Sequence, residues 1–183
     1  MKKNTLIIII ILAITYSCAK APNPFLVEKH NIGLLTDSTQ VKDLEAIFSK
    51  DSIVKSIAGD EFTGAINSIE IFEKNGTKLL DVSPKEALDS TSVVSSVRII
   101  DERYKTEKNI STLSTFKTIK DNYKISKIDN LINSVVVSVD EINASFTIDK
   151  EELPASMRLN MDLAIDAIQI PDEAKIKYFI IHW

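Results

Sequence analysis

Two segments of the chain carry apolar residues at the spacing of an amphipathic helix. The first follows two residues that are able to cap a helix, Ser38 and Thr39, and its apolar positions are Val41, Leu44, Ile47 and Phe48. The second follows Ser114 and Thr115, and its apolar positions are Phe116, Ile119 and Tyr123. Each segment is short and apolar on one side, so we expect two short helices that each bury a single face.

Most of the remaining chain alternates between apolar and polar residues, as β-strands do. The expected strands cover residues 53–57, 66–72, 79–82, 93–100, 125–128, 135–139, 144–148 and 176–182. Asn75-Gly76 separates the second strand from the third, and Asn-Gly between two apolar runs is a strong hairpin signal. Residues 151–171 have no clear period and predict a loop with a helical turn near Pro154.

The order of these elements repeats along the chain. The spacing of apolar residues in the first helix returns in the second, and Ile66-Asn67-Ser68-Ile69 has a counterpart in Ile132-Asn133-Ser134-Val135. Residues 31–100 and 101–183 would then be two repeats, each a helix followed by an antiparallel meander, and each would bury its apolar face by pairing with its twin. We therefore expect an α+β fold with a mainly antiparallel sheet and two short helices packed on it. Chance similarity of two meanders rich in Ile, Val and Ser is the alternative to a duplication.

The beginning of the chain has the three zones of a secretory signal. Lys2 and Lys3 are positive, residues 6–14 are an unbroken apolar run, and Thr15-Tyr16-Ser17 leads into Cys18. The apolar run is shorter than the roughly 20 residues of a membrane-spanning helix. We therefore expect residues 1–17 to be a signal peptide that is removed.

Cys18 is the only cysteine of the chain, and the small residue Ser17 precedes it. This junction resembles the bacterial lipoprotein signal, in which the cysteine thiol receives a diacylglyceryl group and the new amino terminus is acylated. The resemblance implies a palmitate-type lipid anchor on Cys18 and a place in the cell envelope, on the periplasmic side of the outer membrane. An ordinary secretory signal with an incidental cysteine is the alternative.

We expect the rest of the chain to be one domain that follows a short tether. Residues 18–30 would hold the lipidated Cys18 and a tether, in which Pro22 and Pro24 disfavour helix, and residues 31–183 would form a single α+β domain. Hydrophobic residues make up 44% of the chain and charged residues 26%, which is typical of a folded globular protein. The net charge is −4 and becomes more negative once the leader with its two lysines is removed, which argues against a nucleic-acid partner.

The mature part resembles a known family in the order of its features. The matching segments are Ile32 to Thr39 before the first helix, Val97 to Asp101, Ser114 to Phe116 at the second helix, and a closing strand from Lys175 to Trp183. In this order they are similar to the envelope-stress (sigma-E-regulated) lipoproteins of enteric bacteria. That family has no established enzymatic role, so the resemblance implies a localisation in the cell envelope and a fold.

A search for catalytic chemistry finds little in the sequence. The two histidines, His30 and His182, lack partners at ligand spacing, and the only cysteine is the expected lipidation site. Residues 140–143 (Asp-Glu-Ile-Asn) match no calcium loop and suit a hairpin turn. We expect no catalytic residue, no metal and no cofactor, and a hydrolase using Ser or carboxylates is a minor alternative.

One exposed connection is a candidate binding loop. Asp101, Arg103, Tyr104 and Lys105 lie in a stretch of mixed charge that links the two halves, and binding loops often have this composition, as do ordinary polar connections. We expect a membrane-anchored, non-catalytic envelope lipoprotein that binds an envelope protein or helps to maintain the envelope. A periplasmic module that binds a small ligand or a lipid is the alternative.

Overall fold

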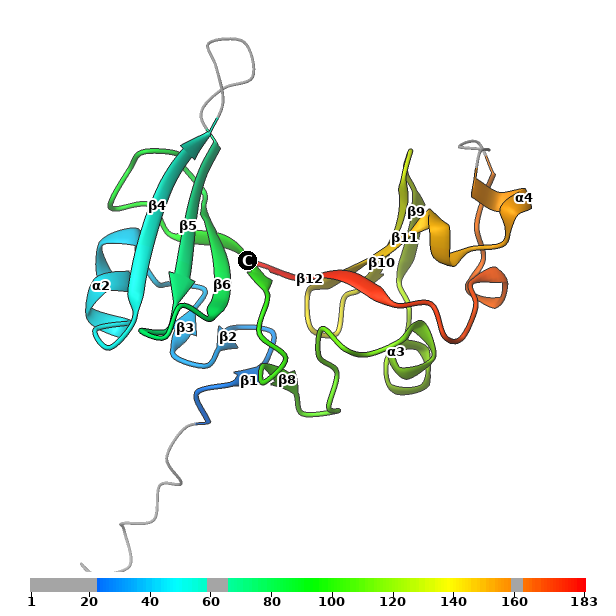
Figure 1. The fold of residues 1–183 in the computed structure, drawn as a ribbon, viewed down its shortest axis with the longest axis horizontal. Coiled ribbons are helices and arrows are strands. Elements are labelled where there is room, and N and C mark those ends of the chain that lie inside the picture. The colour runs from blue at the N-terminus through cyan, green and yellow to red at the C-terminus, as the bar shows by residue number, and fades with distance from the viewer. Residues whose placement is uncertain (1–22, 59–65, 159–162) are drawn as a thin grey trace, which may run out of the picture.

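The computed structural model describes residues 23–58, 66–158 and 163–183, and it has the α+β fold that the sequence predicts (Figure 1). Its largest element is an eight-stranded, wholly antiparallel sheet with the strand order β4-β5-β6-β7-β12-β11-β10-β9. The strands are β4 (Ser52–Ala58), β5 (Ile66–Phe72), β6 (Lys78–Pro84), β7 (Val94–Ile99), β9 (Lys127–Asn130), β10 (Ser134–Val139), β11 (Ala144–Asp149) and β12 (Ile176–His182).

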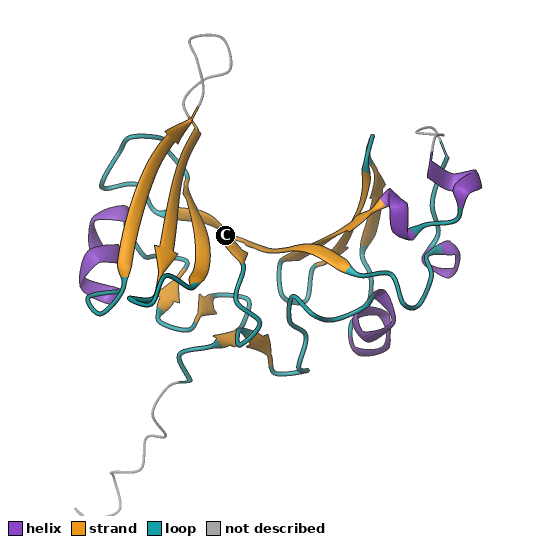
Figure 2. Ribbon diagram, viewed as in Figure 1, coloured by secondary structure: helices purple, strands orange, loops and turns teal. Residues whose placement is uncertain are grey.

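Short helices and a second, small sheet accompany the large one (Figure 2). The helices are η2 (Val41–Asp43), α2 (Leu44–Ile47), α3 (Phe116–Asn122), η3 (Lys150–Glu152), α4 (Ala155–Arg158) and η4 (Ala167–Gln169). The small sheet has the order β3-β2-β1-β8 and consists of β1 (Leu26–Val27), β2 (Asn31–Ile32), β3 (Leu35–Thr36) and β8 (Lys105–Thr106).

The strand order of the large sheet is symmetric about its centre. In the first half a helical segment precedes β4, β5, β6 and β7, and in the second half α3 precedes β9, β10, β11 and β12. The last strand of each half lies at the centre, where β7 and β12 pair antiparallel in a register that sets Val97 opposite Ile181. The two helix-plus-meander units of the prediction are therefore joined through their final strands.

One row of side chains across the large sheet is entirely apolar. The cross-strand partners of this row, taken from β4 to β9, are Ile53, Ile71, Leu80, Ile99, Phe179, Phe146, Val137 and Ile128. The six inner members are at most 2% exposed, and all eight belong to one hydrophobic core or pack against it. The helices contribute to the same core through Leu44, Phe116 and Ile119. Because side chains alternate between faces, this row defines the covered face of the sheet.

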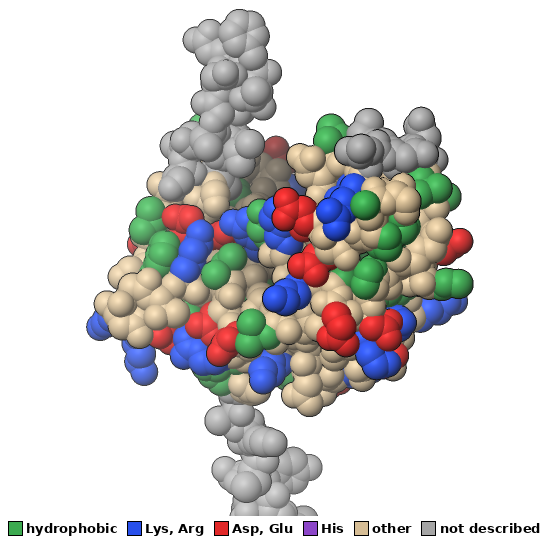
Figure 3. All heavy atoms as spheres, turned by 45° about the vertical axis from the view of Figure 1, so that its right-hand side comes forward, with side chains coloured by type: hydrophobic (Ala, Val, Ile, Leu, Met, Phe, Trp, Pro, Cys, Tyr) green, Lys and Arg blue, Asp and Glu red, His purple; other side chains and the backbone are tan. Residues whose placement is uncertain are grey.

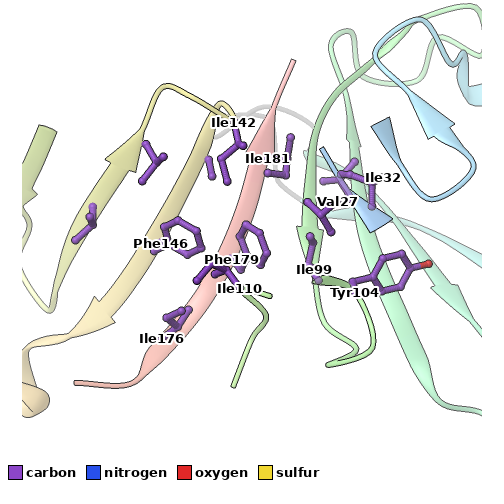
Figure 4. Packing of buried hydrophobic residues seen from close by; sticks show 14 of the residues in the cluster. Val27, Ile32, Ile99, Tyr104, Ile110, Ile142, Phe146, Ile176, Phe179 and Ile181 are labelled. Carbon is purple, nitrogen blue, oxygen red and sulfur yellow. The ribbon is translucent and has the colours of Figure 1, made fainter. Parts of the chain in front are cut away.

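The centre of the covered face packs on the small sheet and on the chain that follows it. Figure 4 shows Phe146 against Phe179, with Ile110 close to β12 and Val27 and Ile32 beyond Ile99. Val27, Ile32 and Ile110 are at most 1% exposed. The small sheet therefore closes the core where the two halves meet.

Three details differ from the sequence-based expectation. Residues 26–30, predicted as part of the tether, belong to the fold, since β1 pairs with both β2 and β8. The N-cap position of the first helical segment is Gln40, which makes no side-chain cap hydrogen bond, and the Thr39 hydroxyl accepts a hydrogen bond from the backbone N–H of Thr36. The small sheet was not predicted, because its two-residue strands are too short to show a period.

Candidate functional site

The second face of the large sheet carries a row of mainly polar side chains. The cross-strand partners of this row, from β4 to β9, are Val54, Glu70, Asp81, Arg98, Ile180, Ser145, Ser138 and Lys127. Each of them is next in sequence to a member of the apolar row, so the two rows point to opposite sides of the sheet. We call this side the open face, because no helix or second sheet of the described residues packs on it in Figure 1.

A cluster of four charged residues lies in the first half of the open face. The Arg98 guanidinium donates two hydrogen bonds to one carboxylate oxygen of Asp81, its Nε at 2.9 Å. The Lys78 ammonium forms ion pairs with Asp81 and with Glu70. Asp81 is only 6% exposed, and these two cations are the ion-pair partners of its buried carboxylate. The cluster is therefore a fixed, nearly neutral patch in the middle of a polar face.

Aromatic and small polar side chains continue the open face into the second half. Tyr178 is 38% exposed, and its ring centroid lies 5.2 Å from the Arg98 guanidinium carbon. Thr147 is its cross-strand partner. Figure 3 shows a hollow between the two grey segments at the top of the view, with acidic and basic side chains close together below it. A partly exposed Tyr beside an Arg is the composition typical of protein interfaces.

Ser145 and His182 form the one pair on the described part of the open face that resembles catalytic machinery. The Ser145 Oγ and the His182 Nε2 lie 2.7 Å apart, and both line a hollow of about 350 Å³. Ser145 is the second residue of β11, which lies between β10 and β12, so the surrounding backbone N–H groups point along the sheet toward neighbouring strands. They are not directed at the face where an oxyanion would form, and the pair is better explained as a structural hydrogen bond.

Burial lowers the pKa of His182 below its usual value of 6.5. The folded protein therefore keeps the imidazole neutral at pH values where the unfolded chain already binds a proton. By linkage, the contribution of His182 to stability is fully present above pH 6.5 and decreases as the pH falls below it. We expect the melting temperature to fall between pH 7 and pH 5.5, and to fall less in His182→Gln. Equal pH dependence in both proteins would contradict this assignment.

The predicted binding loop turns several of its side chains toward the protein. Arg103 donates to both carboxylate oxygens of Asp101 at 2.9 Å and to Glu73 at 2.7 Å, and it stacks on Phe25 with 4.5 Å to the ring centroid. The same guanidinium lowers the pKa of Asp101. Tyr104 is 3% exposed, and burial raises the pKa of its hydroxyl.

Only Arg103 and Lys105 of the predicted loop residues are exposed. A binding role for the loop stays a prediction, and these two side chains are the ones that would carry it.

Cys18, the predicted lipidation site, lies outside the described residues. Within the described ranges, no group of three or more His, Cys, Asp or Glu side chains is placed to hold a metal ion. No helix in the same part of the chain is both long and apolar enough to cross a membrane.

Sequence reasoning missed the open face. Asp81 lies between Leu80 and Val82, and Arg98 lies between Val97 and Ile99. The alternation of each strand therefore predicts that these two polar residues face away from the core. Their ion pair depends on the register between β6 and β7, which includes an irregularity at Ser83 and Pro84. The pattern of single strands predicts the face of a residue but not its cross-strand partner.

The comparisons with known proteins give a likeness of fold. No family model matches the chain, and no curated protein matches it in sequence. A solved structure, that of the uncharacterized protein yfeY from Escherichia coli, is similar with a TM-score of 0.58 and 12% sequence identity. The match covers 86% of this chain and 99% of the other. At this identity the likeness concerns the fold alone.

Proposed function

We propose that the protein is a lipid-anchored envelope lipoprotein without catalytic activity, which binds a protein partner on the open face of its large sheet. The observation that carries the proposal is the open face itself, where the exposed ring of Tyr178 lies beside the half-buried Arg98 in a polar surface. The leader and Cys18 supply the expected anchor. We also propose that the protein is related to the envelope-stress lipoproteins, which the order of sequence features and the fold shared with a bacterial protein support.

The place where the described chain begins supports the proposal that the partner binds on the side of the domain away from the lipid anchor. In Figure 1 the chain enters the described part below the small sheet, whereas the open face of the large sheet is turned the other way. Four residues lie between Cys18 and Asn23, the first described residue, so the two Cα atoms are at most about 18 Å apart in an extended chain. A lipid on Cys18 would hold the domain close to the membrane and present the open face to the periplasm.

The size and nature of the face fit a protein better than a small ligand. A specific interface buries about 800 Å² on each partner. The open face extends over eight strands, and the hollow beside Ser145 and His182 is open to solvent, whereas ligand pockets enclose most of the ligand surface. Its central charges are already paired with each other, so a partner has to match fixed hydrogen-bonding groups.

A photoreactive amino acid at position 178 tests this proposal in living cells. We expect a discrete cross-linked product from Tyr178, and none from Lys42, which is exposed in η2 beside the covered face. Adding Thr147→Arg should abolish the product, since it places a large cation beside Tyr178 on the open face without entering the core. Cross-linking that is equal at both positions, or unaffected by Thr147→Arg, would contradict a specific interface.

A further inference from the structure

A second site lies at the end of the sheet where β9 turns into β10 and β11 leads into η3. It is a hollow of about 550 Å³ that opens on the surface. Its described lining residues are Ile132, Asn133, Asp149, Lys150, Glu151, Arg158 and Lys177. Three of these are basic and two are acidic, although the chain as a whole is acidic. The hollow therefore collects positive charge on an acidic protein.

The side chain of Lys150 is buried without a partner. The residue is 4% exposed, and its Nζ has no hydrogen-bond partner and no carboxylate within ion-pair distance in the described structure. An ammonium group held out of water without a partner is costly. A lysine has a flexible four-carbon stem, so the ammonium is able to swing toward a ligand oxygen that enters the hollow.

Arg158 brings a second cation that is held in place but not neutralised. Its Nε donates to the carbonyl oxygen of Leu153 at 2.8 Å and its Nη2 to that of Glu151 at 2.9 Å. These bonds fix the guanidinium without cancelling its charge, and no carboxylate forms an ion pair with it in the described part of the chain. Donors on a fixed planar group are well suited to a carboxylate or phosphate.

The other charged groups of the hollow do not neutralise these two cations. The Asp149 carboxylate pairs with the Lys177 ammonium at 2.8 Å, which lowers the pKa of Asp149 and occupies both charges. Glu151 is exposed to solvent, and it forms no ion pair with any of the described residues. One acidic side chain thus faces two unpaired cations, and the exposed amide of Asn133 is a further donor.

We infer that this hollow binds an oxyanion, a phosphate or carboxylate group, between Lys150 and Arg158. The ligand oxygens supply the partners that the Lys150 ammonium lacks, and they release the cost of its burial. The site lies near the β9–β10 turn, on the far side of the molecule from the entry of the chain at Asn23 (Figure 1). The inference is independent of the protein partner proposed for the open face.

Titration calorimetry on the full-length protein in a non-ionic detergent tests the site. Sodium phosphate and sodium acetate are added in separate titrations at constant ionic strength, and we expect saturable binding at one site. The anion that binds with the higher affinity identifies the ligand class. Lys150→Met keeps the apolar stem and removes the charge, so binding should weaken at least about tenfold. The matched control is Lys85→Met at an exposed lysine, which should bind as the wild type does.

The melting temperature of Lys150→Met gives a second readout, which should change in the direction opposite to the affinity for the anion. Without added anion, Lys150→Met should melt at the same temperature as the wild type or higher, because it removes an unpaired buried charge. If this variant does not fold, Arg158→Gln is expected to weaken the binding in the same way. The inference is overturned if neither anion binds saturably, or if both variants bind like the wild type.

Discussion

Replacement of Cys18 by alanine is expected to abolish palmitate labelling of the protein and to make it extractable from membranes. Two or more acyl chains on the thiol and the amino terminus attach a protein stably, since each buried methylene contributes about 0.8 kcal/mol. Without the thiol, only the apolar residues 6–14 of the leader remain, and they are too few to span the bilayer. Metabolic palmitate labelling, followed by carbonate extraction of membranes, measures both effects.

The control for this experiment is a substitution that leaves the thiol in place. Lys20→Ala changes the residue two positions beyond Cys18 and should be labelled and fractionate like the wild type. Mass spectrometry of the mature wild type should also show a chain that begins at Cys18. A wild type found unlabelled in the cytosol with residues 1–17 still attached would contradict the anchor and the function built on it.

The hydrophobic pattern predicts the elements of this fold well where they are long. The boundaries of the strands at 66–72 and 176–182 are confirmed to the residue, because each is a seven-residue segment rich in Ile and aromatic residues, which favour strands. The strand expected at 125–128 is observed at Lys127–Asn130 instead. Asn130 is polar yet lies opposite Val135 on the covered face, so its polarity hides the continuation of the strand.

The sites were less accessible to sequence reasoning than the fold. Lys150 stands in a run of charged residues, Asp149 to Glu152, which is typical of a solvated edge. Its burial accompanies the turn into η3, beyond which Leu153 and Met157 are buried as well, and a local pattern does not predict this tertiary arrangement. Likewise, Tyr104 was predicted in a polar loop, and its burial against Phe25 depends on the small sheet.

Phe179→Ala is expected to cause the largest loss of stability among single substitutions in the sheet. Phe179 is fully buried, stacks on Phe146 with 4.7 Å between ring centroids, and lies opposite Ile99 across the seam between the two halves. Removing a buried Phe side chain costs about 3–5 kcal/mol, because the cavity cannot close completely. For a domain of this size that loss corresponds to roughly 6–20 °C in melting temperature. Urea denaturation of the full-length protein in a non-ionic detergent measures the free energy of unfolding.

The neighbouring residue provides the control and links stability to function. Tyr178→Ala removes an aromatic ring from the open face and should cost about 1 kcal/mol or less, because the ring is partly exposed and outside the core. Since β7 and β12 join the halves, unfolding should remain a single transition in both variants. Equal losses for the two substitutions, or a second transition in Phe179→Ala, would contradict one continuous core beneath a separate binding face.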